Sequence, residues 1–209
     1  MNRIDHLVYA TPDLSQGVEE IEALLGVRAS AGGPHPGWGT RNALIALGST
    51  NYLEIIAPDP KQPPPRKPRP FGIDRLAEST LVTWAARSTN LEALAREAGR
   101  GGVRLGAVLS GSRLLPDGIE LSWRLTDPWT VVADGIVPFF IDWGESHHPA
   151  GVAAPGASLV ELRAEHPKWD RVQAMLHTLG LDLSVGEGSQ PALIAVVRGP
   201  RGDVELRSG

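Results

Sequence analysis

The sequence predicts an α+β fold built from tandem units, each with a strand, a helix and three further strands. Two observations carry this prediction. Short segments rich in β-branched and aromatic residues are separated by single helices with clear start and stop signals. The same order recurs along the chain, and aligning Leu91 with Leu14 gives an offset of 77 residues. The chain is therefore expected to consist of repeated βαβββ modules.

The first module covers residues 3–58, and its helix has the strongest sequence signals. Thr11-Pro-Asp13 supplies a capping side chain and a proline in the first turn, and Gly26 suits the left-handed residue that ends a helix. The buried face of this helix is expected to carry Val18, Ile21 and Leu25. The expected elements are a strand at 4–10, a helix at 13–26, a short strand at 27–29, a Gly/Pro-rich loop at 32–39, and strands at 42–47 and 51–57.

The second and third modules repeat this order with decreasing clarity. Residues 1–150 are expected to form one domain, with the second module at 80–145 and a degenerate third module at 157–209. The second module is expected to have strands at about 103–109, 119–126 and 136–143 after its helix. Between the first two modules, residues 58–70 contain seven prolines in thirteen positions, which predicts an extended connector on the surface.

Composition excludes several classes of function. With 209 residues, of which 42% are hydrophobic, the chain can bury a substantial core, and a net charge of −4 leaves no basic stripe for nucleic acid. The absence of cysteine excludes disulfides, zinc–thiolate sites and a cysteine nucleophile. No apolar run approaches the roughly 18 residues of a membrane span, and no leader precedes the first strand, so we expect a cytoplasmic protein that does not bind a membrane.

Two residues in apolar strands stand out as candidates for chemistry. Glu54 lies among Tyr52, Leu53, Ile55 and Ile56, where an unpaired carboxylate is costly to bury, so it needs a metal, a proton or a cation as partner. His6 is an isolated imidazole in the opening strand, and we expect it to meet Glu54. The alternatives are a His6 that is satisfied by a backbone carbonyl or Asp5, and a Glu54 that is paired with an arginine across the sheet.

The Gly/Pro-rich loop supplies candidates for substrate binding. His35 is flanked by Pro34 and Pro36, which restrict the directions available to its imidazole, although a surface histidine without a role is an equal alternative. Trp38, Thr40 and Asn42 lead from the loop into the next strand, where they would offer stacking and hydrogen-bonding groups.

The module order, together with the run Gly32-Gly-Pro-His-Pro-Gly-Trp-Gly-Thr-Arg-Asn-Ala-Leu44 and the later Tyr52-Leu-Glu54, resembles the glyoxalase-like domain family of the vicinal oxygen chelate superfamily. The resemblance covers roughly residues 3–150. It implies paired modules that curl into an open, cup-shaped barrel.

The resemblance also implies a divalent metal held by the first and fourth strands, which maps onto His6 and Glu54, with Asp142 as the acid of the second module. Thr83, at the other second-module position, is a poor ligand. Members include lyases, isomerases, epimerases, ring-cleaving dioxygenases and antibiotic-resistance proteins.

The leading hypothesis is a metal-dependent enzyme that acts on a small oxygenated metabolite by a lyase, isomerase or dioxygenase step. An imidazole with carboxylates suits Zn, Fe, Mn or Ni, and a carboxylate not fully engaged by metal, such as Glu54, can move a proton. The alternatives are a metal-free protein that sequesters a small ligand between tryptophans, and an assembly module with a filled cup. The odd number of modules also points to a homodimer. The candidate metal ligands are His6, Glu54 and Asp142; the candidate substrate-binding residues are His35, Trp38, Thr40 and Asn42.

Overall fold

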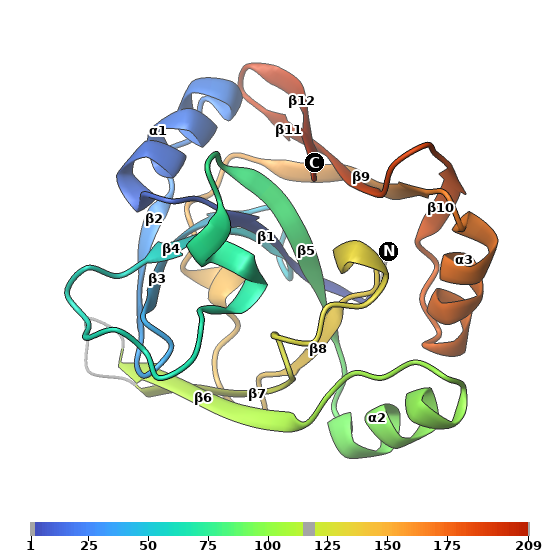
Figure 1. Ribbon diagram of the computed structural model, residues 1–209. Coiled ribbons are helices and arrows are strands. Elements are labelled where there is room, and N and C mark those ends of the chain that lie inside the picture. Colours follow the sequence, from blue (N-terminus) through green and yellow to red (C-terminus); the bar gives the residue numbers. More distant parts are fainter. Residues whose placement is uncertain (1–2, 115–119, 209) are drawn as a thin grey trace.

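The computed structural model describes residues 3–114 and 120–208, and its first two modules share one eight-stranded sheet (Figure 1). The first module consists of β1 (Ile4–Ala10), α1 (Leu14–Leu25), β2 (Ser30–His35), β3 (Thr40–Ala46) and β4 (Tyr52–Pro58). The second consists of β5 (Thr80–Arg87), α2 (Leu91–Arg100), β6 (Val108–Leu114), β7 (Glu120–Thr126) and β8 (Phe139–Asp142). The strand order is β2-β3-β4-β1-β5-β8-β7-β6, so the modules meet through the antiparallel pair β1 and β5. The predicted α+β class with tandem βαβββ modules is confirmed.

The sheet curls into the expected cup. Its two edge strands, β2 and β6, approach each other, and a methyl group added to Gly33 on β2 would lie 2.7 Å from the guanidinium of Arg113 on β6. Apolar side chains including Val8, Ile56 and Trp123 pack on the inner face. A second and larger apolar cluster lies on the outer face, beneath the helices.

Helix α1 begins and ends where its signals predict. The Asp13 carboxylate accepts hydrogen bonds from two backbone amides of the first turn, and Gly26 has a φ of 76°, in the left-handed region. The expected face of Val18, Ile21 and Leu25 is buried against the outer side of the sheet. Throughout residues 3–114 and 120–208, every helix is too short or too polar to span a lipid bilayer.

The Gly/Pro-rich segment differs from the prediction, because half of it is strand. The strand expected at 27–29 lies instead at Ser30–His35, and His35 ends β2, where it pairs with Thr40. Pro34 fits this strand because β2 is at the edge of the sheet, so its missing N–H removes no ladder bond on the outer side. His35 therefore lies on a strand and not in a loop.

The strands of the second module are also shifted from their predicted positions. The strand expected at 103–109 lies at Val108–Leu114, and β8 is shorter than the predicted 136–143. Val103 and Leu105 read as strand residues because they are apolar, but they are buried in the outer cluster from a loop that follows α2. The sequence pattern alone does not distinguish an apolar residue in a strand from an apolar residue buried from a loop.

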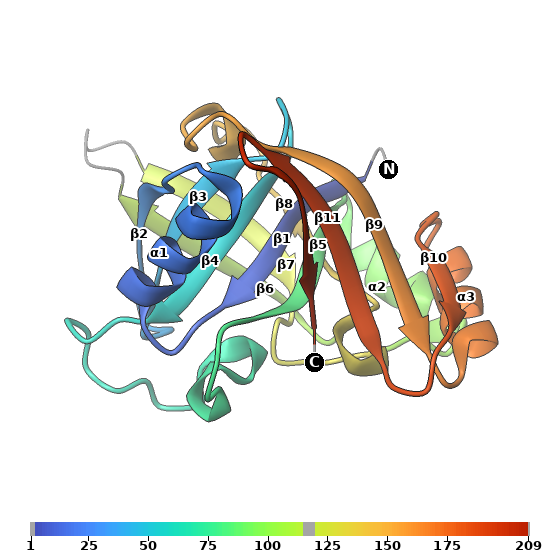
Figure 2. The same ribbon diagram turned by 90° about the horizontal axis from the view of Figure 1, so that it is seen from above.

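The third unit has the expected element order but a different strand order. Its elements are β9 (Ser158–His166), α3 (Trp169–Thr178), β10 (Ser184–Glu187), β11 (Ala192–Gly199) and β12 (Gly202–Arg207). They form a separate sheet ordered β10-β9-β11-β12, in which the first strand lies inside the sheet and does not pair with the last. Figure 2 shows β9, β11 and β12 beside the main sheet. Its apolar face shares the outer cluster with the first two modules through residues such as Ala195, Val197 and Leu206. Pairing with a second copy stays a prediction.

The proline-rich connector is extended and is tied to the rim of the cup. Its end leads into a short 3-10 segment, Pro70–Arg75, which lies in front of the curled sheet in Figure 1. The Arg69 side chain donates to the Gly39 carbonyl at 2.7 Å, and the Trp129 indole donates to the Pro68 carbonyl at 2.7 Å. These bonds hold the connector across the region where Phe71 enters the inner apolar cluster.

Candidate active site

His6 and Glu54 lie on the same inner face of two neighbouring strands. β1 and β4 are parallel, with His6 opposite Tyr52 and Val8 opposite Glu54. Because side chains two residues apart share one face of a strand, the imidazole and the carboxylate are diagonal neighbours. His6 Nε2 lies 3.8 Å from Glu54 Oε2, and both side chains are at least nine-tenths buried. The expected meeting of these two residues is confirmed.

The other nitrogen of His6 is held by Asp5. The register between β1 and β5 shifts between Ile4 and His6, so Asp5 is the extra residue of a bulge. Without the bulge, adjacent side chains would point to opposite faces. Asp5 Oδ1 lies 2.7 Å from His6 Nδ1. Because a carboxylate only accepts, neutral His6 carries its proton on Nδ1 and presents the Nε2 lone pair to Glu54. From the sequence, pairing of His6 with Asp5 and contact of His6 with Glu54 were stated as alternatives. In the structure His6 lies beside both residues.

Asp5 is fully buried and stays ionised because donors surround it. His148 Nε2 lies 3.0 Å from Asp5 Oδ2, and the Trp143 indole donates from 3.2 Å. The Arg87 guanidinium lies 3.5 Å away. Burial alone would raise the pKa of Asp5, but the hydrogen bonds from His148 and His6 outweigh it and lower the pKa well below its usual range. Asp5 thus fixes both the orientation and the tautomer of His6.

His35, Thr40 and Asn42 form a hydrogen-bonded chain that ends on Glu54. Asn42 Nδ2 donates to Glu54 Oε1 at 2.6 Å and lies 3.2 Å from His35 Nε2. His35 Nδ1 lies 2.9 Å from the Thr40 hydroxyl. Burial, opposed by the nearby Glu54 charge, lowers the pKa of His35 to about 4, so the ring is neutral at neutral pH. Since Asn42 donates, His35 Nε2 accepts, and its lone pair also faces Glu54 Oε1 at 3.8 Å.

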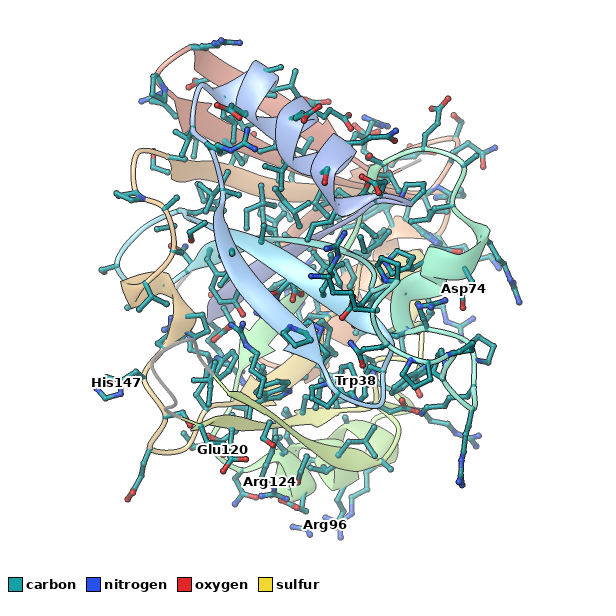
Figure 3. All side chains as sticks on the ribbon, turned by 90° about the vertical axis from the view of Figure 1, so that its left-hand side faces the viewer. Trp38, Asp74, Arg96, Glu120, Arg124 and His147 are labelled. Carbon is teal, nitrogen blue, oxygen red and sulfur yellow. The ribbon has the colours of Figure 1, made fainter. Side chains whose placement is uncertain are left out.

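Asp142 does not join this group. On β8, Phe139 and Ile141 face the inner apolar cluster, so Asp142 points to the outer face, where it accepts from the Gly144 amide at 2.9 Å. Its cross-strand partner Arg124 forms an ion pair with Glu92 of α2, and Figure 3 shows Arg124 on the outside of the sheet. A one-residue difference in register reverses the face of a strand residue. The expected third ligand is therefore corrected to an outer-face residue.

The second module presents apolar side chains where the first presents an imidazole and a carboxylate. In the parallel pair β5–β8, Ala85 lies opposite Phe139, which corresponds to His6 opposite Tyr52 in the pair β1–β4. Thr83, the position expected from the sequence offset, donates its hydroxyl to the Gly135 carbonyl at 2.9 Å. The imidazoles, the carboxylate and the guanidinium that line the cavity come from the first module and from β6.

The side chains of His6, His35 and Glu54 offer nitrogen and oxygen ligands that suit a transition metal, but these atoms lie farther apart than the ligand atoms of a metal-bound site. Bonds of about 2.1 Å in tetrahedral or octahedral geometry place ligand atoms roughly 3.0–3.4 Å apart, against the 3.8 Å separations on either side of Glu54. Over residues 3–114 and 120–208, no set of three such side chains is close enough to enclose an ion as it stands. The Nε2 atoms of both imidazoles nonetheless lie beside Glu54. Asn42 engages His35 Nε2 and Glu54 Oε1, but His6 Nε2 and Glu54 Oε2 are two facing acceptors that need a cation, a proton or water between them.

These groups line a small cavity of about 40 Å³ inside the cup. His35, Trp38 and Asn42, expected from the sequence, contribute to its wall, whereas Thr40 does not and acts only through His35. Figure 3 shows Trp38 beneath the β2–β3 hairpin, and its ring lies 5.3 Å from that of Trp129. The cup is thus largely filled by side chains, and the space that remains is lined mainly by apolar and aromatic residues, with a few polar groups such as His6, Glu54 and Asn42 among them.

A larger cavity of about 530 Å³ lies next to the small one. Phe71 and Phe139 line both cavities, with ring centroids 5.5 Å apart. The large cavity also borders Gln190 and Ser208 of the third unit. It contains no imidazole, so the chemistry of the site belongs to the smaller cavity.

Sequence reasoning missed four residues of the site. Asp5 was considered only as a partner that would make His6 structural, and His148 lies between the second and third modules. Tyr52 stacks on His6, with ring centroids 4.6 Å apart. Arg113 lies on β6, inside the gap between two predicted strands. A sequence signal existed only for Asp5, through its position beside His6.

A curled sheet made of two βαβββ modules, with a polar site on its inner face, defines a vicinal oxygen chelate fold. A family model described as a glyoxalase-like domain matches residues 4–180, and the chain therefore belongs to the glyoxalase-like domain family of the vicinal oxygen chelate superfamily. A comparison with curated proteins finds no match.

Solved structures are similar to this chain at low sequence identity, and the one with the higher TM-score has the same fold. A hypothetical protein from Staphylococcus aureus has a TM-score of 0.63 and 16% identity, over 98% of this chain and 84% of that chain. A methylmalonyl-CoA epimerase from Mycobacterium tuberculosis has a TM-score of 0.45 and 20% identity, over 68% of this chain and 88% of that one. A Streptomyces coelicolor methylmalonyl-CoA epimerase variant, in complex with 2-nitronate-propionyl-CoA, has a TM-score of 0.45 and 22% identity, over 70% and 98%.

Proposed function

We propose that this protein is an enzyme that acts on a small oxygenated metabolite, with a divalent transition metal held by His6, His35 and Glu54. One observation carries the proposal: the Nε2 atoms of two buried imidazoles each lie 3.8 Å from an oxygen of the same buried carboxylate, and all three side chains line one small cavity. Neutral imidazoles with one carboxylate suit Zn, Fe, Mn or Ni. A contraction of several tenths of an ångström brings the three groups within range of one ion.

The surrounding residues prepare these three groups for that role. Asp5 accepts a hydrogen bond from His6 Nδ1, which leaves His6 Nε2 free to act as a ligand, and the Thr40 hydroxyl accepts from His35 Nδ1. His35 Nε2 becomes a ligand when Asn42 gives up its 3.2 Å hydrogen bond to that atom. Asn42 holds Glu54 Oε1 and leaves Oε2 facing the cavity. A bound divalent ion supplies Lewis-acid stabilisation of negative charge on substrate oxygens.

The reaction supported best is a proton transfer of the lyase or isomerase type. Glu54 Oε2 is the carboxylate oxygen that Asn42 does not engage, so it can remove a proton from a substrate carbon and return it. The cavity of about 40 Å³ holds only the reacting end of a metabolite. The remainder is expected to extend past Phe71 towards the larger cavity. A dioxygenase reaction would differ from this proton transfer because it consumes molecular oxygen, which an oxygen electrode measures.

The second candidate is a metal-free binding protein of the same fold. It is favoured by the aromatic wall of the cavity, which includes Trp38, Trp123 and Trp143, and by the apolar residues of the second module. In that case the hydrogen bond from Asn42 is enough to stabilise the buried Glu54 carboxylate without a metal. The cavity then binds a small ligand and catalyses no reaction.

Elemental analysis and metal titration separate the two. Protein prepared without chelator and titrated with Zn²⁺, Mn²⁺ and Ni²⁺ is expected to bind about one equivalent. His6→Gln is expected to lose it, because one of the two imidazole ligands is gone. His147→Gln is the matched control: this histidine is exposed, and Figure 3 shows it at the edge of the molecule. Equal binding by both variants, or none by the wild-type protein, contradicts the metal site.

A further inference from the structure

Arg113 is a buried cation in the same cavity, and part of its guanidinium has no partner among the residues that the structure describes. It is 4% exposed, lies on the inner face of β6, and contributes to the cavity that contains His6, His35 and Glu54. Its Nη1 is buried and finds no hydrogen-bond acceptor among the described residues. No carboxylate lies within ion-pair distance of it in the same part of the chain, residues 3–114 and 120–208.

A buried guanidinium nitrogen without an acceptor is costly, so its position requires an explanation. The penalty for an unpaired buried charged donor exceeds that of a neutral group. Burial lowers the pKa of Arg113, while Glu54 opposes this effect, yet an arginine stays charged at any physiological pH. The fold also makes room for it, because a methyl group on Gly33 would lie 2.7 Å from Nη1.

The groups around Arg113 favour a small anion of single charge. Tyr52 lines the same cavity, and its phenol is a hydrogen-bond donor. Glu54 is a negative charge close enough to stabilise Arg113, which disfavours a second, doubly charged group. A cavity of about 40 Å³ accepts a group the size of a few water molecules. A carboxylate meets these conditions of size and charge.

We propose that Arg113 binds a carboxylate of the substrate, so that the enzyme acts on a small carboxylic acid. This inference names the substrate class of the proposed site, and it rests on that proposal for calling the ligand a substrate. The fork of the guanidinium suits a carboxylate in a bidentate or single hydrogen bond. Arg113 would orient the acid so that the adjacent carbon faces Glu54.

The test compares two probes of similar size, glyoxylate and its neutral amide, glyoxylamide. Binding is measured by quenching of tryptophan fluorescence, since Trp123 and Trp143 line the cavity, and by calorimetry. The variants are Arg113→Met, which keeps the length of the side chain and removes the charge, and Arg113→Lys, which keeps the charge and removes the fork. Arg104→Met is the control, because Arg104 is exposed before the same strand.

Wild-type protein is expected to bind glyoxylate at millimolar concentration or better, and about 10- to 100-fold more tightly than glyoxylamide. Arg113→Met is expected to lose that preference, Arg113→Lys to keep part of it, and Arg104→Met to keep all of it. If Arg113→Met fails to fold, Arg113→Lys provides the test, because it is expected to lose part of the preference for glyoxylate. Equal affinity for the two probes, no binding of glyoxylate by the wild-type protein, or unchanged binding in the folded variants overturns the inference.

The same titrations in His6→Gln separate this inference from the metal proposal. A variant that binds no metal but still prefers glyoxylate through Arg113 supports the anion site and contradicts only the view that metal is needed for binding. A wild-type protein that binds metal but shows no preference for glyoxylate contradicts the anion site alone.

Discussion

Replacing Asp5 by asparagine tests the network that orients His6. The side chain is fully buried and accepts from His6, His148 and Trp143 at 2.7–3.3 Å. Asparagine has the same shape, but its amide turns N–H groups towards at least one of these donors. Hydrogen bonds to a charged group are worth about 1.5–3 kcal/mol each, and breaking a buried charged network costs about 3–5 kcal/mol. We expect Asp5→Asn to lose about 3 kcal/mol of unfolding free energy, or roughly 6–12 °C in Tm.

The pH dependence of this loss follows from the lowered pKa of Asp5. A carboxyl whose pKa is lower in the folded state stabilises the protein above the pKa of the unfolded chain, about 3.9, and loses that contribution as the pH falls through the folded value. The difference in unfolding free energy between the wild-type protein and Asp5→Asn is therefore expected to be constant from about pH 5 to pH 8. It is expected to shrink below about pH 4.

Urea unfolding, followed by tryptophan fluorescence at several pH values, measures both quantities. Asp182→Asn is the control, since Asp182 is exposed, and it is expected to stay within about 0.5 kcal/mol of the wild-type protein. A loss below about 1 kcal/mol in Asp5→Asn, or a gap that persists unchanged at low pH, would refute the role assigned to Asp5. Metal affinity is expected to fall about 10- to 100-fold in the same variant, because His6 loses its orienting partner.

Three further predictions concern stability. His35 has a pKa of about 4 in the folded protein against about 6.5 in the unfolded chain, so stability is expected to fall as the pH drops between these values. Urea titrations of His35→Asn should show a flatter profile there, and an unchanged profile would contradict a buried neutral ring. Gly135→Ala is expected to cost several kcal/mol by thermal unfolding, because the new methyl group would lie 2.3 Å from a β5 carbonyl. Gly72→Ala, with similar positive φ but open space, should cost only about 1 kcal/mol, and equal losses would show that the clash is relieved. Gly199→Ala places a methyl group 2.3 Å from a carbonyl of α1, so limited proteolysis should release the third unit faster than in Gly186→Ala. Equal rates would show that this contact does not hold the unit.

The fold was predictable where local signals and long-range pairing agree. The capped helix α1, the two strands that carry His6 and Glu54, and the repeat at the offset of 77 all lie as expected. β2 was missed because a strand at the edge of a sheet tolerates Gly33 and Pro34, which otherwise indicate a loop. The third unit kept its element order, but pattern does not determine which strands pair, and its first strand lies inside the sheet.

The sequence predicted the two central residues of the site, His6 and Glu54, but not every residue that surrounds them. His6 and Glu54 follow from a polar residue in each of two apolar strands. Asp142 satisfied the same pattern but faces outwards, because one residue of register decides the face of a short strand such as β8. Arg113 reaches the cavity only because the two edges of the sheet come together, and no sequence rule describes that closure.

The most direct test of the central claim is the anomalous-difference map of a crystal soaked in Mn²⁺ or Zn²⁺. The account predicts one strong peak inside the cup, within bonding distance of His6 Nε2 and Glu54, with Asp5 still hydrogen-bonded to the opposite side of the imidazole. A protein that binds the ion elsewhere, or a map with His6 and Glu54 in contact only with water at saturating metal, would contradict it.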